Sequence, residues 1–234
     1  MGILSKNADV LAVLYGYLAL AFPLMMTVFH HSRLVRRRDD FRAFFLYFIF
    51  FCTAFLVLPA IIVFVVSPDP VWSMVSYGFT TGRSGTGVLF MGASIPIAVL
   101  IAYMGSKDPA MRERYPFSKR ACESLGKFVL FEFSYLVLYY FSWEFLFRGL
   151  LFFPLVPAVG LIPALGIQTV VSTLYHFGHP DTEIYAAAAG GVIFGLIAYA
   201  TGSFLYTVFI HALVGITTDS FLYVRRRRFG TAHE

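Results

Sequence analysis

The sequence predicts an all-α fold, a polytopic bundle of about seven transmembrane helices. Of its 234 residues, 59% are hydrophobic and only 13% are charged, whereas soluble domains carry about 25% charged residues. The 27 phenylalanines are too many for the core of one soluble domain of this size. These observations exclude a soluble enzyme, a nucleic-acid-binding protein and a disordered chain. We expect a single integral membrane domain over residues 1–234, with the lipid bilayer as its surroundings and no nucleic acid as a partner.

Apolar stretches long enough for about 30 Å of hydrocarbon predict the positions of the spans. Four are continuous and three are shorter or interrupted: 11–29, 43–66, 87–105 and 128–157, then 161–176, 184–201 and 203–224. The spans within 11–105 are generic, whereas 128–224 contains the polar motifs described below. Gly191 and Gly195 form a small-xxx-small pair that predicts close helix packing. The step Thr201-Gly202-Ser203 predicts a tight turn between two spans.

The basic residues predict the topology. Of the 18 Lys and Arg residues, 15 fall in three clusters, Arg33–Arg42, Lys107–Lys127 and Arg225–Arg228. Basic loops of this kind stay in the cytoplasm. The predicted numbers of spans between successive clusters, two and then four, are both even, so all three clusters can lie on one side. We therefore expect the N-terminus outside and the C-terminus in the cytoplasm, in a membrane such as the bacterial inner membrane.

Several polar residues fall inside the predicted spans, where a charge costs about 2.5–3.5 kcal/mol. Glu144 and Arg148 are four residues apart, which places them on one helix face as a possible ion pair. His176 ends the fifth predicted span, and His211 lies in the middle of the seventh. Asp219 follows His211 by about two helical turns and lies close to the same face. The second half of the chain is therefore where we expect a functional site.

Each of these residues also has a purely structural interpretation. A buried Glu–Arg pair can serve helix packing alone, and a single buried histidine is commonly a hydrogen-bonded core residue. The segment with His179 and Glu183 is typical of an interfacial loop. Glu132, one turn into its span, is expected to extend its carboxylate to the cytoplasmic surface. The combination of a glutamate, an arginine and two histidines on three neighbouring spans nevertheless favours a catalytic site over packing.

The order of the motifs resembles the CAAX-protease and bacteriocin-processing family of glutamic intramembrane proteases. The resemblance rests on Glu144-x-x-x-Arg148-Gly149, then His176 after an aromatic-rich span, then His211, and it covers roughly 128–224. The Trp-Glu-Phe-Leu-Phe-Arg-Gly segment is similar to one branch of that family. The resemblance implies an endopeptidase, without a cofactor, that hydrolyses a peptide bond in a membrane-embedded or lipid-anchored protein or peptide.

In that family the motifs are Glu-Glu-x-x-x-Arg, then Phe-x-x-x-His, then His followed four residues later by Asn or a small residue. By this resemblance Glu144 acts with His176 to activate water, Arg148 holds Glu144, and His211 stabilises the oxyanion. These four are the predicted catalytic residues. The second group of candidates is His179, Glu183, Asp219 and Trp143.

Three positions depart from the family pattern. Trp143 occupies the place of the first glutamate, Ser172 that of the phenylalanine in the second motif, and Gly215 that of the asparagine. Tyr175-x-x-x-His179 is an alternative frame for the second motif. Trp143 matters most, because the family's first glutamate is the carboxylate that activates water together with the second-motif histidine.

Several hypotheses therefore remain open. Glu144 activates water by itself, or Glu183 or Asp219 replaces the missing carboxylate, or the site is inactive and the protein is a membrane scaffold or an immunity-type protein. A zinc ion held by a glutamate and two histidines is an alternative to the cofactor-free mechanism. From the helical rise, Glu144 and His211 lie within a few ångströms of one depth in a core of about 30 Å, whereas His176 lies deeper towards the cytoplasm.

Overall fold

The computed structural model describes residues 3–29 and 39–229, and this part of the chain is mainly helical, without a strand, as predicted. The α-helices in chain order are α1 (Ile3–Thr27), α3 (Asp40–Cys52), α4 (Leu58–Val66), α5 (Pro70–Ser76), α6 (Ser84–Gly105), α7 (Pro109–Arg114), α8 (Leu125–Ser134), α9 (Phe141–Glu144), α10 (Phe153–Val159), α11 (Leu161–Leu174), α12 (Asp181–Thr201) and α13 (Leu205–Phe229). Three π-helical segments join some of them: η1 (Thr53–Val57), η3 (Tyr135–Tyr140) and η4 (Phe145–Phe152). A short 3-10 helix, η2 (Arg120–Glu123), precedes α8.

The described residues contain six helices or continuous helical runs that are long and apolar enough to cross a membrane. They are Asp9–Thr27, Asp40–Val66, Ser84–Gly105, Leu125–Val159, Asp181–Thr201 and Leu205–Arg228. The fifth of the seven predicted spans is instead the apolar helix α11, which has 14 residues and a length of about 21 Å. The polytopic bundle is thus present with a helix at every predicted position, but α11 is too short to cross the hydrocarbon by itself.

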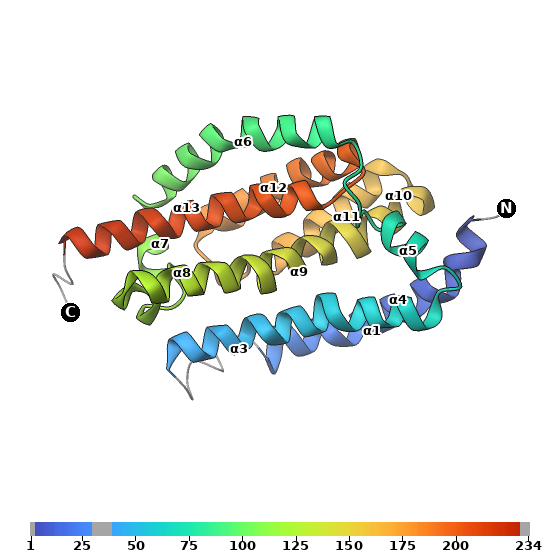
Figure 1. The fold of residues 1–234 in the computed structure, drawn as a ribbon, viewed down its shortest axis with the longest axis horizontal. Coiled ribbons are helices and arrows are strands. Elements are labelled where there is room, and N and C mark those ends of the chain that lie inside the picture. The colour runs from blue at the N-terminus through green and yellow to red at the C-terminus, as the bar shows by residue number, and fades with distance from the viewer. Residues whose placement is uncertain (1–2, 30–38, 230–234) are drawn as a thin grey trace.

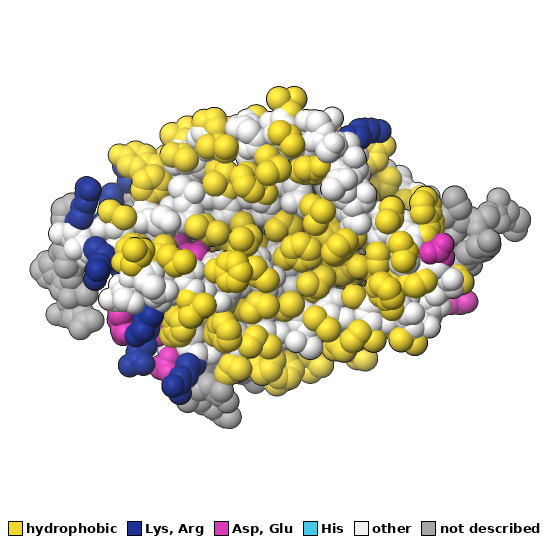
Figure 2. Space-filling model, viewed as in Figure 1, with side chains coloured by type: hydrophobic (Ala, Val, Ile, Leu, Met, Phe, Trp, Pro, Cys, Tyr) yellow, Lys and Arg dark blue, Asp and Glu magenta, His cyan; other side chains and the backbone are white. Residues whose placement is uncertain are grey.

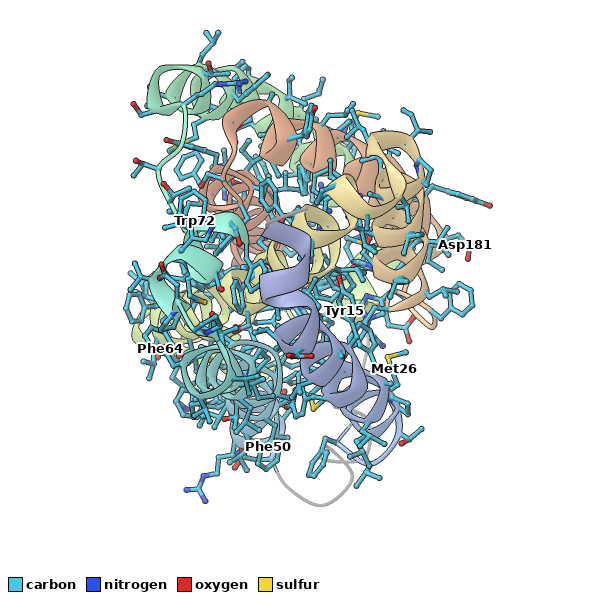
Figure 3. The ribbon with its side chains drawn as sticks, turned by 90° about the vertical axis from the view of Figure 1, so that its right-hand side faces the viewer. Tyr15, Met26, Phe50, Phe64, Trp72 and Asp181 are labelled. Atoms are coloured by element: carbon cyan, nitrogen blue, oxygen red, sulfur yellow. The ribbon has the colours of Figure 1, made fainter. Side chains whose placement is uncertain are left out.

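The helices run roughly along one axis, and charge is segregated along that axis. Figure 1 shows α1 beginning at one end of the bundle and α13 finishing at the other. On the face shown in Figure 2, most Lys and Arg side chains lie at the end where α13 finishes, and hydrophobic side chains predominate among the coloured side chains between the two ends. Seen end-on, Tyr15 of α1 lies within the bundle, whereas Phe64 and Asp181 lie on opposite sides (Figure 3). This distribution is that of an integral membrane protein.

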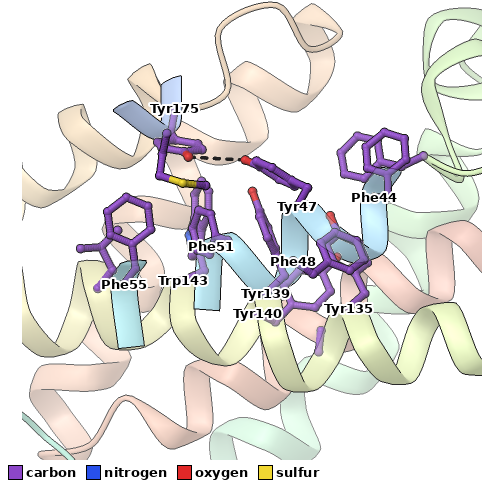
Figure 4. Close-up of a cluster of buried hydrophobic side chains, with 14 of the residues drawn as sticks. Phe44, Tyr47, Phe48, Phe51, Phe55, Tyr135, Tyr139, Tyr140, Trp143 and Tyr175 are labelled. Atoms are coloured by element: carbon purple, nitrogen blue, oxygen red, sulfur yellow. Dashed lines mark hydrogen bonds between the residues drawn. The ribbon is translucent and has the colours of Figure 1, made fainter. Parts of the chain in front are cut away.

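An aromatic cluster joins the N-terminal helices to the motif-bearing half. On α3, Phe48 stacks on Tyr135 with ring centroids 4.8 Å apart, and Phe51 lies 4.4 Å from Tyr139. Figure 4 shows these rings facing one another, together with the hydroxyl contact between Tyr47 and Tyr175 at 3.4 Å. Such ring pairs contribute about 0.5–1.5 kcal/mol each beyond the area they bury. The N-terminal helix α3, which carries no polar motif, therefore packs against the half of the chain that contains the motifs.

The α11–α12 hairpin confirms the packing expected from the small residues. Gly191 lies against Thr169, and its carbonyl accepts a hydrogen bond of 2.7 Å from Gln168 Nε2. Gly195 lies against Leu165 of the same neighbouring helix. The predicted turn after α12 is present as well, with Gly202 at φ +71°, a left-handed conformation that glycine adopts without strain.

We predict that Gly191→Ala destabilises the protein, because the added methyl would lie 2.8 Å from Thr169 Cγ2 and 3.1 Å from its Cα. The expected loss is about 1–3 kcal/mol. Gly190→Ala is the matched control, since its methyl would meet a single ring carbon of Phe194 at 3.9 Å and alanine favours the helix by about 1 kcal/mol. Thermal unfolding in detergent measures both variants, and equal transition temperatures would contradict the close helix contact.

Candidate active site

Glu144, Arg148 and His211 form one buried polar cluster. Glu144 ends α9, Arg148 is one turn later in η4, and His211 comes from α13. Glu144 Oε1 accepts a hydrogen bond of 3.3 Å from Arg148 Nη1 and one of 2.7 Å from His211 Nδ1. The guanidinium also lies over the ring of Phe194, 5.4 Å from its centroid. The ion pair expected from the i, i+4 spacing is present. Glu144 and His211 are in direct contact, which agrees with the similar depths that the helical rise predicted for them.

The local helix geometry places these groups at the centre of the bundle. The four-residue α9 lies between the π-helical segments η3 and η4, and π-helical turns change which residues face a neighbouring helix. Pro154, in the first turn of α10, cannot donate a backbone hydrogen bond into η4. The sequence analysis did not predict these π-helical turns.

The hydrogen bond between His211 and Glu144 determines the tautomer of the imidazole. An ionised carboxylate can only accept, so Nδ1 carries the hydrogen and Nε2 is left for another partner. The carboxylate side chain is 0% exposed, whereas the His211 side chain is 21% exposed. The accessible member of this pair is therefore the histidine, and the glutamate lies behind it.

Trp143 packs against both of the histidines that the sequence predicts to be catalytic. Its ring centroids are 5.0 Å from the His176 ring and 6.0 Å from the His211 ring, both edge-on. The indole is 2% exposed and stacks on Phe51. Glu144 hydrogen-bonds His211, while the predicted contact of Glu144 with His176 is not among the hydrogen bonds of the described residues. At the position that the resemblance assigns to the first glutamate, the structure therefore has a buried indole.

His176 lies just beyond α11, in the turn that leads into α12. Its Nδ1 is 2.9 Å from the carbonyl oxygen of Ser172, and because a carbonyl only accepts, Nδ1 carries the hydrogen here too. The ring packs against His179, with centroids 5.6 Å apart. Since α11 ends at Leu174, His176 lies two residues beyond the helix and not in its last turn.

A second carboxylate–histidine pair joins this turn to the first turn of α12. His179 Nδ1 is 2.9 Å from Glu183 Oε1, which also accepts a hydrogen bond of 2.6 Å from the hydroxyl of Tyr115. Burial raises the pKa of Tyr115 well above its usual value, so the hydroxyl is a neutral donor. Tyr115 had no signal in the sequence, because it comes from a loop with no spacing relation to α12. The expected loop is present at His179, whereas Glu183 belongs to the first turn of α12.

Asp219 does not join the Glu144 cluster. It lies on α13 with its carboxyl group close enough to Glu132 of α8 for the two to interact electrostatically. Both side chains are buried, and none of their four oxygens forms a hydrogen bond of standard geometry with a described residue. The expectation that Glu132 extends to the surface is therefore wrong, because Asp219 faces it from the neighbouring helix.

The part of the chain that the structure describes contains no group of three or more His, Cys, Asp or Glu residues arranged to hold a metal ion. Glu144 and His211 are joined directly by a hydrogen bond, and Trp143 contacts the rings of both His176 and His211. The zinc alternative and the cofactor-free mechanism both remain predictions that metal analysis can separate.

We predict that Arg148→Met costs about 3–5 kcal/mol of stability, because it leaves the buried carboxylate of Glu144 without its cation. The double variant Glu144→Gln/Arg148→Met should recover most of this loss, since it removes both charges. Chemical unfolding of the wild type, both single variants and the double variant measures the coupling between the two residues. A double variant as unstable as the sum of the single ones would contradict the ion pair.

A comparison with protein families identifies the motif-bearing half. Residues 126–217 match the model of the Rce1-like family, which is described as type II CAAX prenyl endopeptidase Rce1-like. This match confirms the resemblance drawn from the motifs, and it contains Glu144, Arg148, His176 and His211 but not Asp219. The assignment to one branch of the family stays a prediction. Neither the comparison with curated proteins nor the comparison with solved structures found a match.

Proposed function

We propose that this integral membrane protein is an endopeptidase that hydrolyses a peptide bond of a membrane-associated protein or peptide at the Glu144–His211 pair. The family match over residues 126–217 supports a protease of the CAAX type. The observation that carries the proposal is the 2.7 Å hydrogen bond from His211 Nδ1 to the fully buried carboxylate of Glu144. This bond leaves Nε2 of a partly exposed imidazole available for proton transfer.

In the proposed mechanism His211 Nε2 takes a proton from water as the water attacks the scissile carbonyl carbon. Glu144 stabilises the imidazolium that forms, and Arg148 compensates the charge of Glu144 while the imidazole is neutral. The imidazolium then gives the proton to the leaving amine, as a general acid. A buried carboxylate that orients a histidine in this way is the arrangement found in hydrolytic triads.

This assignment differs from the one that the resemblance implies, because His211 takes over the activation of water from His176. His176 packs against Trp143, and its Nδ1 is held by the Ser172 carbonyl. Its Nε2 is left unprotonated, so we assign His176 to substrate positioning. Glu183 is held by His179 and Tyr115, and Asp219 interacts with Glu132. Neither carboxylate therefore replaces the one that Trp143 removes, and Glu144 is the carboxylate that acts.

A non-catalytic scaffold of the same fold is the second candidate function. The observation in its favour is the buried Trp143, which stands where the family has a carboxylate and brings no group able to accept a proton. The proposed orientation, with the basic end in the cytoplasm of a bacterial cell, applies to both candidates. The two differ only in whether the Glu144–His211 pair meets a substrate.

We predict that Glu144→Gln lowers peptide cleavage at least 100-fold, the lower end of what general acid–base catalysis contributes, while the protein remains folded. The measurement is cleavage of a membrane-peptide library by purified protein, with His211→Gln and His176→Ala assayed in parallel. Glu123→Gln is the control, because Glu123 is half-exposed and pairs with Lys127 at the basic end. A Glu144→Gln variant that is folded and as active as the wild type would refute the mechanism.

We also predict that cleavage proceeds without stoichiometric metal. Metal analysis of the purified protein, with the cleavage rate measured before and after chelation, tests this. The glutamate–histidine mechanism requires an unchanged rate after chelation. A rate that falls on chelation and returns with added zinc would favour the zinc alternative.

A further inference from the structure

An open pocket of about 630 Å³ lies at the basic end of the bundle, apart from the Glu144 cluster. Its walls come from the start of α3, from α7 and the loop after it, and from the turn between α11 and α12. This volume falls within the range of small-molecule sites, about 300–1,000 Å³. The proposed function makes no use of this pocket.

The pocket is lined by charges of both signs. Arg114 and Lys119 supply two cationic groups, and Asp40 and Glu113 supply two carboxylates. A site for a simple anion would leave the carboxylates facing negative charge. The arrangement is complementary to a ligand that carries one negative and one positive group at the same time.

The carboxylate of Asp40 requires a hydrogen-bond donor. Its Oδ2 accepts hydrogen bonds from the backbone N–H groups of Lys119 and Arg120, at 2.6 and 3.2 Å. Its Oδ1 is buried and has no hydrogen-bond partner among the described residues. A buried acceptor without a donor is unfavourable, and a ligand N–H group would supply the missing hydrogen bond.

The cationic side of the pocket favours an anionic group. Burial, with the charge of Arg226 as a further cause, lowers the pKa of Lys119 to about 8. Negative charge brought near Lys119 would favour its charged form. Lys119 Nζ donates one hydrogen bond, of 3.0 Å, to the carbonyl of Pro116, and an ammonium has three N–H donors to offer.

Two aromatic rings form the apolar part of the pocket. Phe44 and Phe117 stack with centroids 5.0 Å apart and planes within 7°, and the guanidinium of Arg114 lies over the Phe117 ring. Aromatic rings next to basic side chains are typical of the level at which a bilayer meets water. At that level the available zwitterions are lipid headgroups, whose acyl chains continue along the apolar surface of the bundle.

We propose that this pocket binds the headgroup of phosphatidylethanolamine, with the phosphate beside Arg114 and Lys119 and the ammonium beside Asp40 and Glu113. An ammonium provides N–H donors for Asp40 Oδ1, which the quaternary nitrogen of phosphatidylcholine does not. Phosphatidylglycerol provides the phosphate but no positive charge for the carboxylates. The selectivity expected from the pocket is therefore for ethanolamine over choline and over glycerol.

The test titrates dihexanoyl phosphatidylethanolamine, phosphatidylcholine and phosphatidylglycerol into the purified full chain in a non-ionic detergent, with binding read by native mass spectrometry. We expect phosphatidylethanolamine to bind at least 10-fold more tightly than the other two. Glu113→Gln should reduce its advantage over phosphatidylcholine, and Arg114→Gln should weaken both because both contain the phosphate. Glu123→Gln and Lys127→Gln, at the same end outside the pocket lining, should change neither.

Two results would overturn the proposal. The first is a loss of the predicted binding pattern, which means phosphatidylglycerol or phosphatidylcholine binding as tightly as phosphatidylethanolamine. An Arg114→Gln variant with unchanged lipid affinity would be the same kind of result. The second is a short zwitterionic peptide that displaces the lipid and whose own binding depends on Glu113 and Arg114, which would identify the pocket as a peptide site. Thermal unfolding of each variant confirms that the fold is retained. The readout is lipid affinity, so the outcome does not depend on peptidase activity.

Discussion

The buried carboxylate of Glu144 is the group around which the rest of the site is arranged. A carboxylate with 0% exposure has a large desolvation cost unless its charge and lone pairs are matched. Arg148 on the next turn supplies the charge, and His211 from α13 supplies the shortest hydrogen bond. This arrangement joins two helices that are far apart in sequence, and it orients an imidazole at the edge of the cluster, where a substrate can meet it.

The aromatic packing holds Trp143, and not a carboxylate, next to the two histidines of the candidate site. Trp143 stacks on Phe51 of α3 and contacts the rings of His176 and His211. The N-terminal helices thereby determine the position of an indole at the centre of the candidate site. Since Trp143 brings no carboxylate, proton transfer in the proposed mechanism depends on Glu144 and on the histidine that it orients.

Much of this arrangement was predictable from local patterns. Apolar length located the six helical runs long enough to cross a membrane and α11, the i, i+4 spacing predicted the Glu144–Arg148 pair, and small residues predicted the contact of Gly191 with Thr169. The π-helical segments, the early end of α11 and the burial of Glu132 were not predictable, because each depends on which side chain a neighbouring helix presents. The contact of Tyr115 with Glu183 was not predictable for the same reason, because the two residues are 68 positions apart in the sequence.

The most direct test of this account is the protonation of the histidine rings, measured by ¹⁵N NMR with His211 and His176 assigned through single substitutions. The account predicts that the neutral His211 ring carries its hydrogen on Nδ1 and that its resonances shift in Glu144→Gln, while those of His176 stay unchanged. A His211 ring protonated on Nε2, or a response to Glu144→Gln confined to His176, would contradict it. Such a response would restore His176 as the partner of Glu144.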